Sequence, residues 1–298
     1  MRVAVDPHML RAQPVEKVFE TISRVGYPWM ELSPRADILP LFTGRRAGRD
    51  MAARVRRTAA DSSVGIASVW VVYRWSSPDR DEREAAVRYW LQAIDLAVEL
   101  GCDRLNTELS GDPLRREASE AALWRSLDVI VPRLEAEGLT LSVEPHPGDL
   151  TEDGQQTLDL LRGVRSRSLR YLHCAPHTFH LGASPLEVVR AAGDDLGHVH
   201  LADTFRPDRI VVNPPDAAVS VHQHLDIGQG EVDFEALFRA LADIGFDGVL
   251  TTSVFFWDER AEDSFRHNLA AVRRLMSAVG LALTVRKDGH GAEIDAGR

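Results

Sequence analysis

The chain has 298 residues, of which 44% are hydrophobic, and a formal net charge of −10. This composition excludes a globally disordered chain, because it provides enough apolar side chains for a large core. The acidic balance weighs against nucleic acid as a partner, since phosphate binding requires a basic surface, and it favours a small, uncharged ligand.

Cysteine content and the first residues indicate where the protein is found. Cys102 and Cys174 are too few for a disulfide framework and favour a reducing compartment. Residues 1–6 have the pattern of a strand and lack the apolar run of a signal peptide. No apolar stretch is long enough to cross a bilayer. We therefore expect a cytoplasmic protein with no membrane partner.

Strand and helix patterns alternate along the chain. Short runs of β-forming residues predict strands, and apolar residues spaced three and four apart predict helices. The expected strands are residues 2–6, 27–32, 65–73, 103–108, 139–144, 169–174, 196–201 and 248–255. The expected helices are residues 14–25, 50–60, 81–100, 116–137, 151–161 (with Thr151 as N-cap), 184–192, 233–244 and 258–279.

Eight strand–helix units predict a single-domain α/β protein, a (β/α)8 TIM barrel. The barrel is expected over residues 1–280, and the polar residues 281–298 are expected to form a flexible C-terminal tail. An open doubly wound sheet is the alternative, although no GxGxxG motif follows the first strand. In a barrel, side chains at the carboxyl ends of the strands line one mouth.

The segment LTLSVEPHPG places two polar side chains at that mouth. Its apolar run ends at Glu144, and Pro145 and Pro147 prevent the strand from continuing because proline has no N–H to donate. Glu144 and His146 are therefore expected in the ligand crevice, and a solvated turn is the alternative. The other expected strand-end side chains are Asp6, Glu31, Glu108, Cys174, His200 and Ser253.

Histidines are concentrated in the second half of the chain, where eight of the 11 lie between positions 146 and 224. Neutral imidazole is the commonest metal ligand and also acts as an acid or base near pH 7. By two-residue alternation His198 and His200 point the same way, as do His222 and His224 if that segment is extended. His177 would complete a three-histidine metal site. His173 alternates out of phase with Cys174 and is expected to pack between barrel and helix.

Several segments together resemble the sugar phosphate isomerase/epimerase superfamily, the xylose isomerase-like barrels. They are LSVEPH (141–146), residues 163–177, HVHLAD (198–203), HLDIGQGEVD (224–233) and GFDGV (245–249). The resemblance covers nearly the whole chain. It implies one divalent metal, Mn²⁺ or Zn²⁺, held by a Glu after strand five, an Asp after strand six, a His on strand seven and a Glu on strand eight.

Two of these four ligand positions match this chain, namely Glu144 and His200. Cys174 and Ser253 occupy the positions of the other Asp and Glu. The zinc-dependent endonuclease branch of the superfamily offers a replacement, because residues that hold a further metal there correspond to His177, His222 and His224. On this hypothesis the metal has moved to three histidines.

The resemblance implies proton abstraction next to the carbonyl of a keto-sugar. Glu144 and His146 are the candidates for base and acid, and His200 for orienting the substrate. Glu108, Arg206 and Trp75 are expected to contact a sugar or glycoside substrate, Trp75 by stacking its ring.

The outcome of proton abstraction is left open between isomerisation, epimerisation and elimination. Ser253 is a poor base, which favours one-base isomerisation or elimination over two-base epimerisation. The segments RW (74–75), NTELSG (106–111) and VHQHL (221–225) resemble proteins found near sugar-oxidising dehydrogenases. The large subunits of C-glycoside deglycosidases, which cleave a 3-oxo-sugar from its aglycone, are a related branch. A homo-oligomer or a hetero-oligomer with a small subunit is the corresponding expectation for partners. An endonuclease and a catalytically degenerate sugar-binding barrel are the remaining alternatives.

Overall fold

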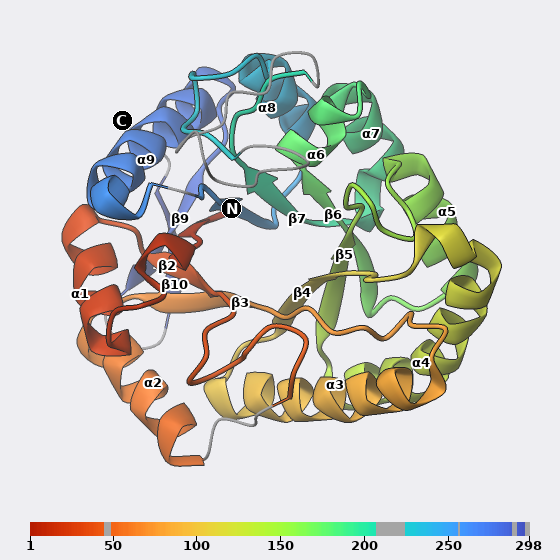
Figure 1. The fold of residues 1–298 in the computed structure, drawn as a ribbon. Coiled ribbons are helices and arrows are strands. Elements are labelled where there is room, and N and C mark those ends of the chain that lie inside the picture. Colours follow the sequence, from red (N-terminus) through yellow and green to blue (C-terminus); the bar gives the residue numbers. More distant parts are fainter. Residues whose placement is uncertain (45–48, 207–223, 256, 288–290, 296–298) are drawn as a thin grey trace.

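Eight parallel strands close into a barrel in which β1 pairs with β2 on one side and with β8 on the other (Figure 1). The computed structural model describes residues 1–44, 49–206, 224–255, 257–287 and 291–295. The strands are β1 Arg2–Val5, β2 Trp29–Leu32, β3 Gly65–Trp70, β4 Arg104–Glu108, β5 Thr140–Glu144, β6 Leu169–Cys174, β7 Leu196–Leu201 and β8 Val249–Thr252. This arrangement confirms the single-domain TIM barrel expected from the alternating pattern.

A ring of helices covers the outside of the barrel (Figure 1). The helices are α1 Val15–Val25, α2 Arg49–Asp61, α3 Arg80–Leu100, α4 Arg116–Glu137, α5 Gly154–Val164, α6 Ala175–His180, α7 Pro185–Ala192, α8 Phe234–Asp243 and α9 Ala261–Ala278. Capping residues in the sequence determine where these helices begin and end. In α3, for example, the Asp79 side chain accepts a hydrogen bond from the Glu82 N–H at 2.8 Å, and Gly101 ends the helix in the left-handed conformation.

Some boundaries differ from those expected. The prediction that Thr151 caps α5 was wrong, because Asp153 is the N-cap and accepts from the Gln156 N–H at 3.0 Å. Thr151 instead shares a hydrogen bond of 2.7 Å with the Thr157 hydroxyl. Strands β3 and β8 end three residues earlier than expected, since β-forming residues continue past the point where strand pairing stops.

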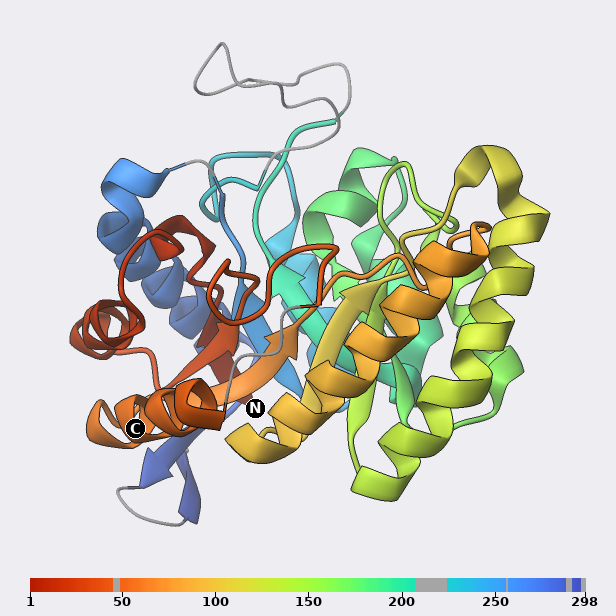
Figure 2. The ribbon, with the colours of Figure 1, turned by 60° about the horizontal axis from the view of Figure 1, so that its bottom comes forward.

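The segment after β8 and α9 contains two further strands. Leu283–Lys287 (β9) pairs antiparallel with Gly291–Asp295 (β10), and the Thr284 N–H donates to the Met1 carbonyl at 2.7 Å. The hairpin therefore lies beside β1, at the end of the barrel where that strand begins (Figure 2). Flexibility of residues 281–298 stays a prediction.

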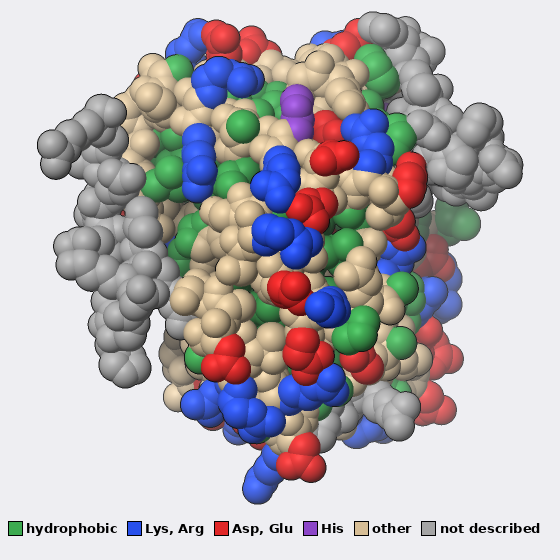
Figure 3. Space-filling view, turned by 90° about the vertical axis from the view of Figure 1, so that its left-hand side faces the viewer, with side chains coloured by type: hydrophobic (Ala, Val, Ile, Leu, Met, Phe, Trp, Pro, Cys, Tyr) green, Lys and Arg blue, Asp and Glu red, His purple; other side chains and the backbone are tan. Residues whose placement is uncertain are grey.

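Acidic and basic side chains are interspersed over the outer face that carries α1 and α9 (Figure 3). Ion pairs join neighbouring helices there, such as Arg24 with Glu262 at 2.7 Å. None of the helices within the described part of the chain has the length and apolar character needed to span a bilayer.

Candidate active site

A cavity of about 330 Å³ lies among residues that follow the carboxyl ends of the strands. Its polar lining includes three carboxylates, Asp6, Glu108 and Glu144, and five imidazoles, His8, His146, His177, His200 and His224. Parallel strands direct their last side chains to this mouth, so residues far apart in the sequence converge here. The cavity is large enough for a small organic ligand.

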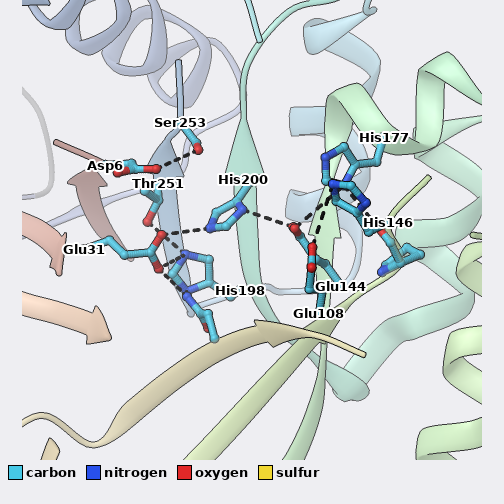
Figure 4. A network of polar contacts seen from close by, with 12 residues as sticks. Asp6, Glu31, Glu108, Glu144, His146, His177, His198, His200, Thr251 and Ser253 are labelled. Atoms are coloured by element: carbon cyan, nitrogen blue, oxygen red, sulfur yellow. Dashed lines mark hydrogen bonds and ion pairs between the residues drawn. The ribbon is translucent and has the colours of Figure 1, made fainter. Parts of the chain in front are cut away.

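His200 lies between two buried carboxylates (Figure 4). Its Nδ1 is 3.2 Å from Glu144 Oε2, and its Nε2 is 3.0 Å from Glu31 Oε1. Because an ionised carboxylate only accepts hydrogen bonds, both ring nitrogens donate and the ring is an imidazolium. Burial lowers the pKa of His200, but the Glu31 charge and hydrogen bonds to Cys174, Glu144 and Glu31 outweigh burial and hold it well above its usual value.

Glu31 anchors this pair deep in the barrel. Its Oε2 accepts from the Ser68 hydroxyl at 2.6 Å and from the Asn106 amide. Burial raises the pKa of Glu31, yet the charge and the hydrogen bond of His200, together with the Ser68 hydrogen bond, outweigh it and bring the pKa to about 2. Glu31 therefore stays ionised and keeps His200 charged.

His198 lies beside this pair but is neutral. Its Nδ1 is 3.1 Å from the Asn106 amide nitrogen and its Nε2 is 2.8 Å from the Thr251 hydroxyl. Burial lowers the pKa of His198 to about 3. Both ring nitrogens of His198 contact protein groups, and His198 does not belong to the cavity lining. Its role is therefore structural: it packs beside His200 and holds Asn106, which contacts Glu31.

Glu144 behaves differently from Glu31, although both contact His200. Burial raises the pKa of Glu144, and the hydrogen bond and charge of His200 only partly offset this effect. Glu144 lines the cavity, whereas Glu31 does not. Of the two carboxylates, Glu144 is thus the one that takes up a proton more readily and can reach a ligand.

His177 and His224 meet on the same side of the cavity, although 47 positions separate them. His177 Nδ1 is 3.1 Å from the Pro145 carbonyl, and His224 Nδ1 is 2.7 Å from the Ser253 carbonyl. Since a carbonyl only accepts, each Nδ1 carries a proton, which leaves the two Nε2 atoms facing each other; in a neutral ring this nitrogen has a lone pair that can bind a metal. Burial lowers the pKa of His224 to about 3, so this ring is neutral.

The spacing of these two imidazoles suits a tetrahedral metal ion. The Nε2 atoms are 3.3 Å apart, and two ligand nitrogens at about 2.0–2.1 Å from a tetrahedral zinc are separated by about 3.3 Å. Cys174 lies close enough to act with His177 and His224, all three ligand atoms being within 4.8 Å of one another. A cation at this position would relieve the close approach of two acceptor nitrogens.

Two other groups of possible ligands share residues with the His200 network. Glu144, Cys174 and His200 form one, and Glu31, His198 and His200 form the other. In the group of Glu31, His198 and His200, the first two residues already form hydrogen bonds with Ser68, Asn106 and Thr251. The group of Glu144, Cys174 and His200 contains both residues that match the ligand positions of the family. Its third member, Cys174, stands at the position where an Asp was expected.

The structure brings most of the site residues expected from sequence to the cavity. His146 packs edge-on against His177 with ring centroids 4.6 Å apart, and its Nε2 is 3.8 Å from Glu108 Oε2. Glu108, Glu144, His146, His177, His200 and His224 all line the cavity. His222 lies outside the described residues.

Two expected substrate contacts are placed elsewhere. Trp75 is fully buried, packs against Trp90 and donates its indole N–H to the Glu108 carbonyl at 3.0 Å, because the chain after β3 turns towards the helix layer. The guanidinium of Arg206 lies 4.8 Å from the centre of the Phe179 ring. Neither side chain belongs to the cavity lining, so the expectation that Trp75 stacks on substrate has no support in the structure.

Asp6 supplies a carboxylate next to Ser253, where the family pattern has a glutamate. The Ser253 hydroxyl donates to Asp6 Oδ2 at 3.1 Å, and the His8 N–H donates to Oδ1 at 2.9 Å. Burial raises the pKa of Asp6. The strand pattern predicted Asp6 and Glu31 as strand-end acids, but their partners come from distant strands and could not be assigned from sequence.

Comparison with known proteins agrees with this architecture. The family described as Xylose isomerase-like TIM barrel matches residues 19–275. An uncharacterized protein, MJ1188, of Methanocaldococcus jannaschii is 22% identical over 252 residues, covering 84% of this chain and 87% of that protein.

Solved structures share the fold at low sequence identity. D-psicose 3-epimerase with D-tagatose, from Clostridium cellulolyticum H10, has a TM-score of 0.73 at 15% identity, covering 93% of this chain and 99% of that chain. The IOLI protein with a bound zinc atom has a TM-score of 0.73 at 16% identity, covering 94% of this chain and 99% of that chain.

Proposed function

Because the chain belongs to the xylose isomerase-like TIM barrel family, we propose that it abstracts a proton next to the carbonyl of a keto-sugar, as a metal-dependent isomerase or epimerase. One observation carries the proposal: Glu144 and His200, which Glu31 holds from behind, line the same cavity as the His177–His224 pair. This combination provides a carboxylate base beside a metal-binding pair. The epimerase and zinc-containing structures with the same fold are consistent with it.

The proposed metal ligands are His177 and His224, with His222 or Cys174 as a third. Two imidazoles and a thiol favour Zn²⁺ over Mn²⁺, because soft ligands select zinc. When bound, the ion would polarise the substrate carbonyl and stabilise the negative charge that develops on its oxygen. The two Nδ1–H donors to backbone carbonyls fix the orientation of the rings for this role.

Glu144 is the proposed base. It is buried, and that burial raises its pKa towards the range in which a carboxylate accepts a proton efficiently. His200 holds Oε2, and the other oxygen, Oε1, lies 3.8 Å from Nδ1 of the proposed metal ligand His177. Glu31 acts only through His200, by keeping that imidazolium charged and in place.

His146 is the proposed acid that returns the proton. Its side chain is about one-third exposed, with 30% of its surface accessible, and Glu108 holds its Nε2 side. It can therefore exchange protons with solvent while remaining next to the cavity. Glu108 also offers an acceptor to a sugar hydroxyl.

Elimination from a 3-oxo-glycoside is the second candidate reaction, and Asp6 favours it. A carboxyl group whose pKa burial raises can carry a proton. The Ser253 hydroxyl holds the Asp6 carboxyl in place. From there Asp6 can donate its proton to the atom of the leaving aglycone, an oxygen in an O-glycoside or a carbon in a C-glycoside. The same group would also serve as a second acid in epimerisation, so substrate screening must include both reactions.

Metal content and proton exchange test the proposal together. We expect about one zinc per chain in the wild type by elemental analysis, lost in a His177→Ala, His224→Ala double variant and retained in a His267→Ala control on α9. Deuterium from solvent should enter the carbon next to the carbonyl of a ketose or a 3-oxo-glucoside in the wild type, and Glu144→Gln should abolish this exchange. Wild-type protein that holds no metal after incubation with zinc, manganese or cobalt, and exchanges no deuterium, would contradict the proposal. Sugar binding without exchange would instead support a non-catalytic barrel.

A further inference from the structure

One part of the cavity lining is apolar, and its residues are not used by the proposed chemistry. This apolar rim consists of Leu41, Phe42, Trp70, Val72 and Phe255. Leu41 is 45% and Phe42 44% exposed. Among the described residues only four other large apolar side chains are comparably exposed, and none of those lines the cavity. Two adjacent exposed apolar side chains at the edge of a cavity indicate a binding surface.

Phe42 is held in a conformation that a bulky residue rarely adopts. Its φ is 58°, in the left-handed region. The backbone N–H donates to the Val72 carbonyl at 3.0 Å, and the Arg74 guanidinium lies 4.9 Å from the centre of the ring. These contacts fix the loop in a strained arrangement that leaves the ring partly exposed at the cavity. Such strain is typical of functional positions.

The charges of the lining restrict the ligand further. Among the described lining residues there is no Lys or Arg, whereas Asp6, Glu108 and Glu144 contribute carboxyl groups. A phosphate group would meet these acids without a guanidinium or ammonium partner, and the His200 imidazolium is already paired with Glu31 and Glu144. Hydroxyl groups, in contrast, find several acceptors and donors among the carboxylates and imidazoles.

We propose that the ligand of this cavity is a non-phosphorylated sugar that carries an aromatic substituent, with the substituent packed against Phe42 and Leu41. The inference deepens the proposed function, because it takes the same cavity as the substrate site. The sugar lies among the carboxylates and imidazoles, and the substituent extends over the apolar rim. An aryl glycoside has this division into a hydroxylated ring and a flat apolar group.

Binding of matched glycosides tests this inference without requiring turnover. The probes are phenyl and methyl β-D-glucopyranoside, their 3-oxo counterparts and glucose 6-phosphate, titrated by calorimetry into zinc-loaded protein. The phenyl glycosides should bind about three- to tenfold more tightly than the methyl glycosides, since stacking on an aromatic ring contributes that much. Glucose 6-phosphate should bind most weakly.

Variants of Phe42 locate the effect. Phe42→Ala should remove the preference for the phenyl group and leave methyl glycoside binding unchanged, and Leu114→Ala, at a side chain 94% exposed away from the cavity, should change neither. Phe42→Gly is a second variant that tolerates the left-handed backbone. It should lose the preference while melting no lower than Phe42→Ala.

The inference is overturned if the wild type binds phenyl and methyl glycosides equally or not at all, if Phe42→Ala weakens both alike, or if the phosphate binds most tightly. Its failure is distinct from failure of the proposed function. Deuterium exchange without a phenyl preference would refute the inference alone. A Phe42-dependent phenyl preference without exchange would refute only the proposed reaction.

Discussion

Replacing Glu31 by Gln should destabilise the protein by about 3 kcal/mol, and the geometry shows why. Glu31 is fully buried, with Oε1 accepting from His200 and Oε2 from Ser68 and Asn106. Glutamine offers one oxygen and one NH2 group, so in either orientation at least one buried donor faces another donor. That loss costs about 1–3 kcal/mol, and breaking a buried ion pair costs about 3–5 kcal/mol. The two ranges describe the same lost contacts and are not added. Glu144 still compensates part of the His200 charge, so the expected cost is about 3 kcal/mol, at the lower end of the second range.

Urea unfolding at pH 7 measures this free energy of unfolding. A matched control is Glu235→Gln on α8, where the same substitution removes an exposed ion pair with Arg239 at 2.9 Å. That pair should contribute less than about 0.5 kcal/mol. If Glu31→Gln costs less than about 1 kcal/mol, His200 is not an imidazolium held between two carboxylates. The proposed role of Glu31 would then be withdrawn.

Other predictions concern pH and packing. His173 is fully buried, neither of its ring nitrogens has a hydrogen-bond partner among the described residues, and burial lowers its pKa to about 3. Since this side chain binds a proton near pH 6.5 in the unfolded chain, His173→Phe should gain about 2 kcal/mol more stability at pH 5 than at pH 8, measured by urea unfolding at both values. The folded protein raises the pKa of His200, so this residue stabilises the fold fully below about pH 6.5 and loses that effect as pH rises through the folded-state pKa. The free energy of unfolding of the wild type should therefore fall more steeply at alkaline pH than that of His200→Gln. A Cβ at Gly230 would overlap the Thr204 carbonyl and Asp203, so Gly230→Ala should lower the free energy of unfolding by about 1–3 kcal/mol, seen as a lower urea midpoint with unchanged slope. An unchanged midpoint would show that this loop adjusts freely.

Much of the fold could be predicted from sequence because its signals are local. Period-two and period-3.6 patterns identified the eight strands and the eight helices that follow them, and barrel closure follows from their number. Alternation along β7 also predicted that His198 and His200 lie on one side. In the structure their ring centroids are 5.2 Å apart. The short helix α6 was missed because six residues carry too little periodicity, although it is the element that positions His177.

Sequence by itself determined which chemical groups end the strands, since residue type and strand end are both encoded locally. Only the tertiary structure decided which of these groups meet. Glu31 and His200 are 169 positions apart, yet they form one ion pair because β2 and β7, which are not neighbours in the barrel, both direct these side chains into its interior. Tertiary packing also places Trp75 against Trp90 and away from the cavity, whereas Phe42 lines it. The physical reason is that local pattern sets the direction of a side chain within its element, whereas its partner depends on how the barrel places distant elements side by side.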